Sequence, residues 1–109
     1  MRRLISGRSV RRVEIGLEGT HTFLVEHYWP GVSVRAFRAA ADQVRAAAEE
    51  ISLANAPIHF LHSTLVPEDE NAFCVFSAAS AALVEQAYRR AGVGFERIVD
   101  ALELEERSR

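Results

Sequence analysis

Side chains that can do chemistry fall within three short β-type segments of this 109-residue chain. Glu26 and Tyr28 alternate in T-F-L-V-E-H-Y-W, and His62, Thr64 and Cys74 lie on either side of P-E-D-E-N. Histidine nitrogen, cysteine sulfur and glutamate oxygen are competent ligands for zinc, nickel or copper. The same set suits acid–base chemistry or the binding of a small polar molecule.

A transition-metal site is one interpretation, with His62, Cys74 and Glu26 as the expected ligands and nickel or zinc as the metal. The chain has one cysteine and contains no Cys-x-x-Cys and no His-x-x-x-His, so no familiar metal motif is present. His59 and His62 lie three apart, and such residues point to opposite faces of a regular strand. The identity of any cofactor therefore stays open.

Two other interpretations use the same residues. An imidazole exchanges protons near neutral pH and Tyr28 can orient a carbonyl, so a small organic molecule is a candidate ligand. The sequence fixes no nucleophile–base pair, which argues against an enzyme without excluding one, and no catalytic residue is assigned. In a purely structural interpretation, His62 bonds to backbone at a dimer interface and Cys74 is a small buried residue.

The first predicted elements are a strand and a helix. Thr22–Trp29 is rich in β-branched and aromatic residues and ends at Pro30-Gly31, as strands before turns do. Ser33 is a predicted N-cap of a helix that ends before Pro57. The inward stripe of this helix recurs at spacings of three and four: Phe37, Ala41, Val44, Ala48 and Ile51.

Two strands, a second helix and a last strand are predicted for the rest of the chain, so that each half is a strand–helix–strand unit. Ile58–Val66 and Phe73–Ser77 are predicted strands joined by the polar turn P-E-D-E-N. Ser80 caps a second helix, and Gly92 suits its left-handed C-terminal cap. A last strand is predicted over Glu96–Leu104. The inward stripe of the second helix is Val84, Ala87, Tyr88 and Ala91.

The element order predicts an α+β fold, a ferredoxin-like βαββαβ sandwich in which two helices cover one face of a four-stranded antiparallel sheet. Side chains alternate between the faces of a strand, so parity assigns them. We assume that the middle hairpin turns symmetrically about Asp69, which puts Thr64 opposite Cys74. The predicted open face then carries Leu24, Glu26, Tyr28, His62, Thr64, Cys74 and Phe76. The predicted helix face carries Phe23, Val25, Leu61, Leu65, Phe73 and Val75.

Composition bounds the remaining properties. The 13 basic and 15 acidic side chains give a net charge of −2, which predicts no nucleic-acid partner, and no apolar run is long enough to cross a membrane. A single cysteine cannot form an internal disulfide, so we expect a reducing, cytoplasmic location. Residues 1–20 form a predicted flexible arginine-rich tail, and residues 21–105 one domain. A chain of this size has a thin core, which favours a homodimer.

Three segments resemble a bacterial family of small domains, some of whose members have been described as nickel-binding ferredoxin-like proteins. They are F-L-V-E-H-Y-W-P-G-V, F-L-H-S-T-L-V-P-E-D-E-N-A-F-C-V-F-S-A-A-S and R-A-G-V-G-F-E-R-I-V-D-A, within residues 22–104. The resemblance implies the ferredoxin-like fold, a homodimer formed through the open sheet faces, and metal binding. The positions that match the recurring pattern of the family are Glu26, Pro30, Gly31, His62, Ser63, Glu68, Asp69, Phe73, Cys74, Gly92 and Ile98.

We therefore expect a dimeric protein that binds a small ligand or a transition-metal ion on its open sheet face. The expected site residues are Glu26, Tyr28, His62, Thr64 and Cys74. One alternative is a dimeric enzyme of the small monooxygenase or isomerase type, which rests on analogy of fold alone. The other is a structural or regulatory interaction module, which should leave an exposed apolar patch.

Overall fold

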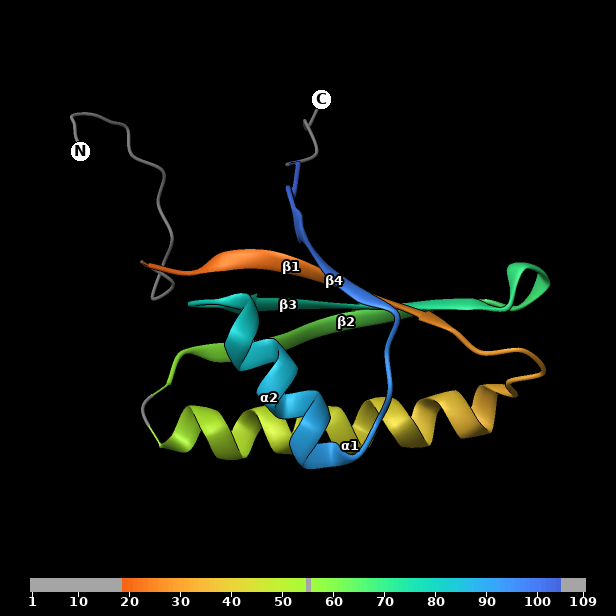
Figure 1. The fold of residues 1–109 in the computed structure, drawn as a ribbon, viewed down its shortest axis with the longest axis horizontal. Coiled ribbons are helices and arrows are strands. Elements are labelled where there is room, and N and C mark those ends of the chain that lie inside the picture. The colour runs from red at the N-terminus through yellow and green to blue at the C-terminus, as the bar shows by residue number, and fades with distance from the viewer. Residues whose placement is uncertain (1–18, 55, 105–109) are drawn as a thin grey trace, which may run out of the picture.

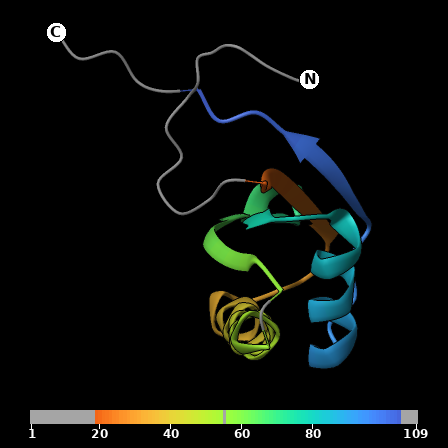
Figure 2. The same cartoon turned by 90° about the vertical axis from the view of Figure 1, so that its left-hand side faces the viewer.

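The protein has two layers, an antiparallel sheet and a pair of helices that cover one of its faces (Figures 1 and 2). The computed structural model describes residues 19–54 and 56–104. Their elements are β1 (His21–Tyr28), α1 (Val34–Leu53), β2 (Ile58–Val66), the 3-10 turn η1 (Pro67–Asp69), β3 (Asn71–Ala78), α2 (Ala81–Ala91) and β4 (Arg97–Ala101). The strand order is β2-β3-β1-β4, with every neighbouring pair antiparallel. The predicted ferredoxin-like fold is confirmed.

Both helices begin and end where their capping residues predict. The hydroxyl of Ser33 accepts a hydrogen bond from the backbone N–H of Ala36 at 3.0 Å, and the hydroxyl of Ser80 accepts one from Leu83 at 3.4 Å. These bonds satisfy backbone donors that the first turn of a helix leaves free. Gly92 ends α2 in the left-handed conformation, with φ 73°.

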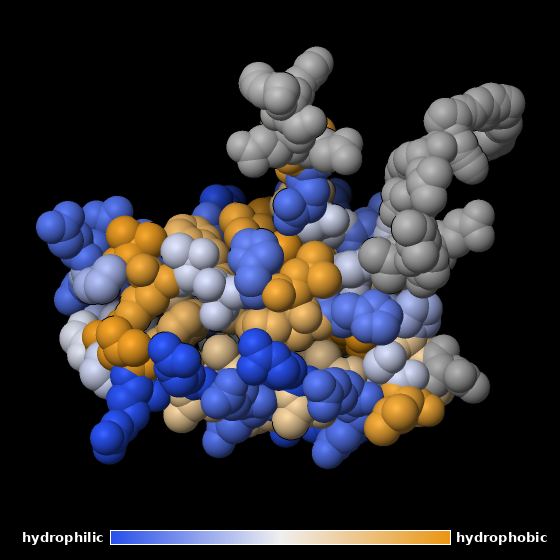
Figure 3. Space-filling model, turned by 180° about the vertical axis from the view of Figure 1, so that it is seen from behind, coloured by the Kyte–Doolittle hydropathy of each residue, from blue (hydrophilic) through white to orange (hydrophobic). Residues whose placement is uncertain are grey.

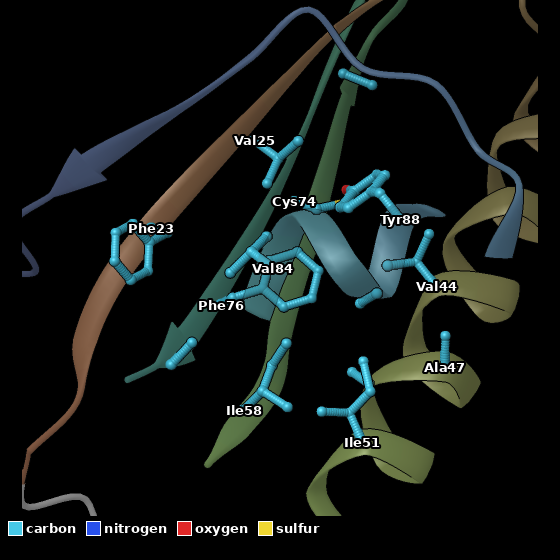
Figure 4. Packing of buried hydrophobic residues seen from close by; sticks show 14 of the residues in the cluster. Phe23, Val25, Val44, Ala47, Ile51, Ile58, Cys74, Phe76, Val84 and Tyr88 are labelled. Atoms are coloured by element: carbon cyan, nitrogen blue, oxygen red, sulfur yellow. The ribbon is translucent and has the colours of Figure 1, made fainter. Parts of the chain in front are cut away.

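The core lies between the sheet and the helices, and Figure 4 shows its side chains converging there from both layers. The predicted stripe of α1 is buried throughout, and so are Val84, Ala87 and Tyr88 of α2. From the sheet, β1 contributes Phe23 and Val25, as predicted. The central strand β3 contributes Ala72, Cys74, Phe76 and Ala78.

The register of the β2–β3 hairpin differs by one residue from the predicted register. Thr64 pairs with Phe73, and Ser63 pairs with Cys74. The turn consists of η1 and Glu70, which takes the left-handed conformation with φ 56°, so it is not symmetric about Asp69. A one-residue slip moves a strand's side chains to the other face. The predicted open-face positions of Cys74 and Phe76 are therefore wrong, and Phe73 and Val75 lie on the open face instead.

A β-bulge interrupts β2. Phe60 pairs with Phe76 and His62 pairs with Val75, while Leu61 between them has no partner. Leu61 is 44% exposed, so its predicted position under the helices is wrong, whereas Leu65 pairs with core residue Ala72 as its predicted face requires.

Two expectations concern the chain outside these elements. The predicted arginine-rich tail over residues 1–20 lies outside the described residues, apart from Gly19 and Thr20. Of the two helices in the described part of the chain, neither combines the length and the apolar character needed to cross a membrane.

Candidate functional site

The open face is the side of the sheet opposite the two helices, above the strands in Figure 1. Register defines its rows, because directly paired residues project to the same side. One row runs from Arg97 through Glu26 and Phe73 to Thr64. The next runs from Val99 through Leu24 and Val75 to His62, and Tyr28 pairs with Asn71 two residues beyond Glu26. Glu26, Tyr28, His62 and Thr64 thus share the face predicted for them.

Glu26 is bound to Arg97 across β1 and β4. The guanidinium donates from Nε to Oε1 at 2.7 Å and from Nη2 to Oε2 at 3.1 Å. This two-bond geometry is the strongest form of arginine–carboxylate contact. The hydrogen bond from Arg97 holds the pKa of Glu26 below its ordinary value, so the carboxylate stays charged. The ion pair with Arg97 therefore accounts for the presence of Glu26 in the middle of a strand, and no bound ligand is needed to explain it.

The structure does not gather the predicted ligands around one point. Glu26 and His62 lie in different rows with all of β3 between their strands, a separation of about 10 Å from the spacing of neighbouring strands. Cys74 lies on the far side of the sheet, 1% exposed. Within residues 19–54 and 56–104, no group of three or more His, Cys, Asp or Glu side chains could hold a metal ion.

The bulge instead brings two histidines to the same face. His59 pairs with Ser77 and His62 with Val75, and Ser77 and Val75 are alternate residues of β3 on the open face. The prediction that the two imidazoles point to opposite faces is therefore wrong. Their spacing resembles that of alternate strand residues, roughly 7 Å along the strand, and both side chains are exposed. No residue type in I-H-F-L-H marks a bulge, so this pair could not be predicted from the sequence.

Figure 3 looks at the protein from behind Figure 1, the side on which β2 and α1 lie. Hydrophilic residues gather along the lower part of this view, over the outer surface of α1. Apolar residues are interspersed with polar ones over the sheet above it. β2 is an edge strand in the order β2-β3-β1-β4, so the two histidines stand at a border of the sheet that a second protein can reach.

A polar cluster inside the core was also missed from the sequence. His27 is 6% exposed; its Nδ1 lies 3.0 Å from the carbonyl oxygen of Ala72, and its Nε2 lies 2.9 Å from the hydroxyl of Tyr88. Tyr88 also hydrogen-bonds with Cys74, which lies beside it in Figure 4. In the sequence, only the even spacing of His27 from Phe23 and Val25 marks it as inward-facing.

The protonation of this cluster follows from its partners. Burial lowers the pKa of His27, so the imidazole is neutral near pH 7. A carbonyl oxygen only accepts, so Nδ1 carries the proton and Nε2 accepts from the Tyr88 hydroxyl. Burial raises the pKa of both Cys74 and Tyr88, so the thiol and the phenol are both neutral. The three side chains form one neutral cluster, in which both nitrogens of His27 are bonded.

Comparison with known proteins places this geometry in context. Residues 23–100 match the protein family described as "Nickel responsive protein SCO4226-like". The fold is similar to the crystal structure of SCO4226 from Streptomyces coelicolor A3(2), with a TM-score of 0.65 and 20% sequence identity over 76% of this chain and 99% of that chain. At this identity the likeness establishes the fold alone. None of the curated proteins matches the chain.

Proposed function

Because the chain belongs to the SCO4226-like, nickel-responsive family, we propose that it is a homodimer that binds a transition-metal ion, nickel foremost, on the open face of its sheet. The observation that carries this proposal is the β-bulge at Leu61, which aligns His59 and His62 on that face. Binding, rather than a reaction, is the proposed activity. The arrangement also revises the ligand set expected from the sequence.

The donor set fits such a metal only in part within one chain. Imidazole nitrogen suits nickel, copper and zinc, and His59 and His62 supply two such donors. Glu26 is engaged by Arg97, and Cys74 lies behind the sheet in the core. Two copies whose open faces meet near β2 supply four imidazoles, enough to complete a coordination sphere. The proposed site is therefore shared between subunits.

The apolar character of the open face supports the proposed dimer. Leu24, Phe73 and Val99, which are only partly buried, occupy its two central rows, on the side of the sheet away from the helices. Val75 between them is already buried, 6% exposed. Tyr28 adds a ring that is 56% exposed. Burial of such side chains against a second copy stabilises association by about 25 cal/mol for each Å² of apolar surface removed from water. The same contact between two copies also removes water from around His59 and His62, the proposed metal ligands.

The test is native mass spectrometry of untagged protein titrated with nickel, zinc and copper salts, with light scattering to give the oligomeric state. We expect a dimer that takes up nickel stoichiometrically. His59→Ala and His62→Ala should each weaken uptake by at least about tenfold, since even the loss of an outer-shell partner costs that much. His21→Ala is the matched control, because His21 is an exposed histidine outside the pair.

Two results would overturn the proposal. Unchanged nickel uptake by a variant with both His59→Ala and His62→Ala places the metal elsewhere. A monomer that binds no metal contradicts both the proposed homodimer and the proposed metal binding. A clean dimer without metal uptake contradicts metal binding and leaves the open face as an association surface.

A further inference from the structure

A pocket of about 740 Å³ opens on the helix side of the protein, beside the carboxyl end of β1. It exists because the helices differ in length: α1 has 20 residues and α2 has 11. Figure 1 shows the first half of α1 extending beyond α2, with the segment that leads to β4 passing alongside. The volume lies within the range of small-molecule sites, about 300–1,000 Å³. None of the open-face histidines lines it.

Aromatic and small side chains form the walls of this pocket. Trp29, just after β1, and Phe95, just before β4, are half-buried in its lining. Ala36, Ala39 and Ala40 line it from α1, and their short side chains leave the space open. These walls suit a flat organic molecule, which can stack on the aromatic rings and be buried against the alanines of α1.

The charge of the lining restricts the ligand further. Within the described residues, the pocket is lined by one carboxylate, Glu96, and by no arginine. Gln43 adds an amide that can both donate and accept. His27 lies at the inner wall but is neutral, and both of its nitrogens are already bonded. An anionic ligand therefore finds repulsion and no cationic partner, whereas a cation finds Glu96 and two aromatic rings.

We infer that this pocket binds a flat, mostly apolar organic molecule that carries an amino or amide group and is uncharged or cationic. The apolar body lies between the Trp29 and Phe95 side and the alanines of α1, and the nitrogen group is directed to Glu96 and Gln43. This site is separate from the proposed metal site, since neither His59 nor His62 lines it, although Tyr28 of the open face does. Each can fail without the other.

Trp29 provides a direct readout, because it is the only tryptophan in the chain and its indole N–H gives one side-chain signal in a proton–nitrogen correlation spectrum. The metal-free full-length protein is titrated at millimolar concentrations with three probes of one shape: naphthylmethylamine, naphthamide and naphthoate. The amine and the amide should shift the Trp29 indole signal together with the backbone signals of Gly94 and Phe95. Naphthoate should bind about tenfold more weakly or not at all.

Variants locate the site and its charge preference. Ala39→Leu fills the pocket from α1 and should weaken binding of the amine about tenfold. Ala46→Leu is the matched control, because Ala46 is also exposed on α1, two turns further on, and does not line the pocket. Glu96→Gln should remove most of the difference between the amine and naphthoate.

Three outcomes overturn the inference. One is the absence of shifts at the pocket with both the amine and the amide. Another is amine binding that Ala39→Leu and Ala46→Leu weaken equally. The third is naphthoate binding as tight as that of the amine in the unaltered protein, which contradicts the proposed ligand class.

Discussion

The hydroxyl of Tyr88 lies 2.9 Å from Nε2 of His27, although the two residues are 61 positions apart in the chain. The contact joins α2 to β1 through the centre of the core. Because His27 also donates to the Ala72 carbonyl of β3, one side chain links a helix and two central strands. Buried polar groups are costly unless every one of them is bonded, so this chain of bonds both stabilises the fold and fixes how its layers meet.

Replacing Tyr88 by phenylalanine should destabilise the protein. Tyr88→Phe keeps the ring but leaves Nε2 of His27 without a donor in the core, and an unsatisfied buried group costs about 1–3 kcal/mol. Urea unfolding near neutral pH measures the loss. Tyr28→Phe is the control, because Tyr28 is 56% exposed and its change should stay within about 0.5 kcal/mol. Equal effects of the two substitutions would show that the hydroxyl of Tyr88 contributes nothing.

Stability should fall as the pH drops below 6.5. The pKa of His27 is lowered in the folded state from its ordinary value of 6.5, so the unfolded chain binds the proton first. Stability is therefore complete above 6.5 and is lost towards the lower folded pKa, with a slope of at most about 1.4 kcal/mol per pH unit for one proton. Unfolding free energies measured between about pH 7.5 and pH 5 should show this slope.

Variants attribute that slope to one residue. His27→Gln should reduce the slope by nearly one proton, and His21→Gln is the matched control at an exposed histidine. Any contribution from Glu26 appears at lower pH, below 4.5, since the Glu26 pKa is itself lowered. A slope that survives His27→Gln would assign the effect to other groups.

Cys74 should be unreactive in the folded protein. Its side chain is 1% exposed and burial raises its pKa, so neither access nor thiolate is available. The thiol reagent DTNB should label it no faster than the protein unfolds, and labelling should become fast in denaturant. Rapid labelling under native conditions would contradict the placement of Cys74 under the helices. Since Cys74 is not a proposed ligand, nickel should change the labelling rate only as far as it slows unfolding of the protein.

Gly92 and Gly94 form a matched pair for backbone strain. Gly92 has φ 73°, a conformation that costs a residue with a Cβ roughly 1–2 kcal/mol. Gly92→Ala should lose about that amount of stability. Gly94 has no such φ, and a Cβ there meets nothing within 4 Å, so Gly94→Ala should be nearly neutral. Thermal unfolding compares the two, and the prediction fails if Gly94→Ala is the more damaging.

The sequence predicted the elements well because local chemistry determines them. The caps at Ser33 and Ser80, the C-cap at Gly92 and the apolar stripes of both helices depend on residues within a few positions of one another. The predicted bounds of β2, Ile58–Val66, are those of the structure. These signals are enough to set the element order, and the order largely determines this fold.

The candidate site depended on register, which the sequence did not determine. β3 is a central strand in which Ala72, Phe73, Cys74, Val75 and Phe76 are all apolar, so alternation does not reveal which set faces the helices. The small thiol of Cys74 fits beside the large ring of Tyr88, a complementarity that only the folded core displays. Glu70 in the left-handed conformation, unusual for a residue with a side chain, made the turn one residue shorter than expected.

Because of the bulge at Leu61, the pairing of β2 with β3 shifts by one residue partway along β2. Upstream of Leu61, paired residue numbers in β2 and β3 sum to 136, as for Phe60 and Phe76; downstream they sum to 137, as for His62 and Val75. A relative that lacks the extra residue can therefore present the same face with its histidines two apart instead of three. Alignment with such a relative needs a single-residue gap at this point, because an ungapped alignment sets equivalent histidines against residues of the opposite face.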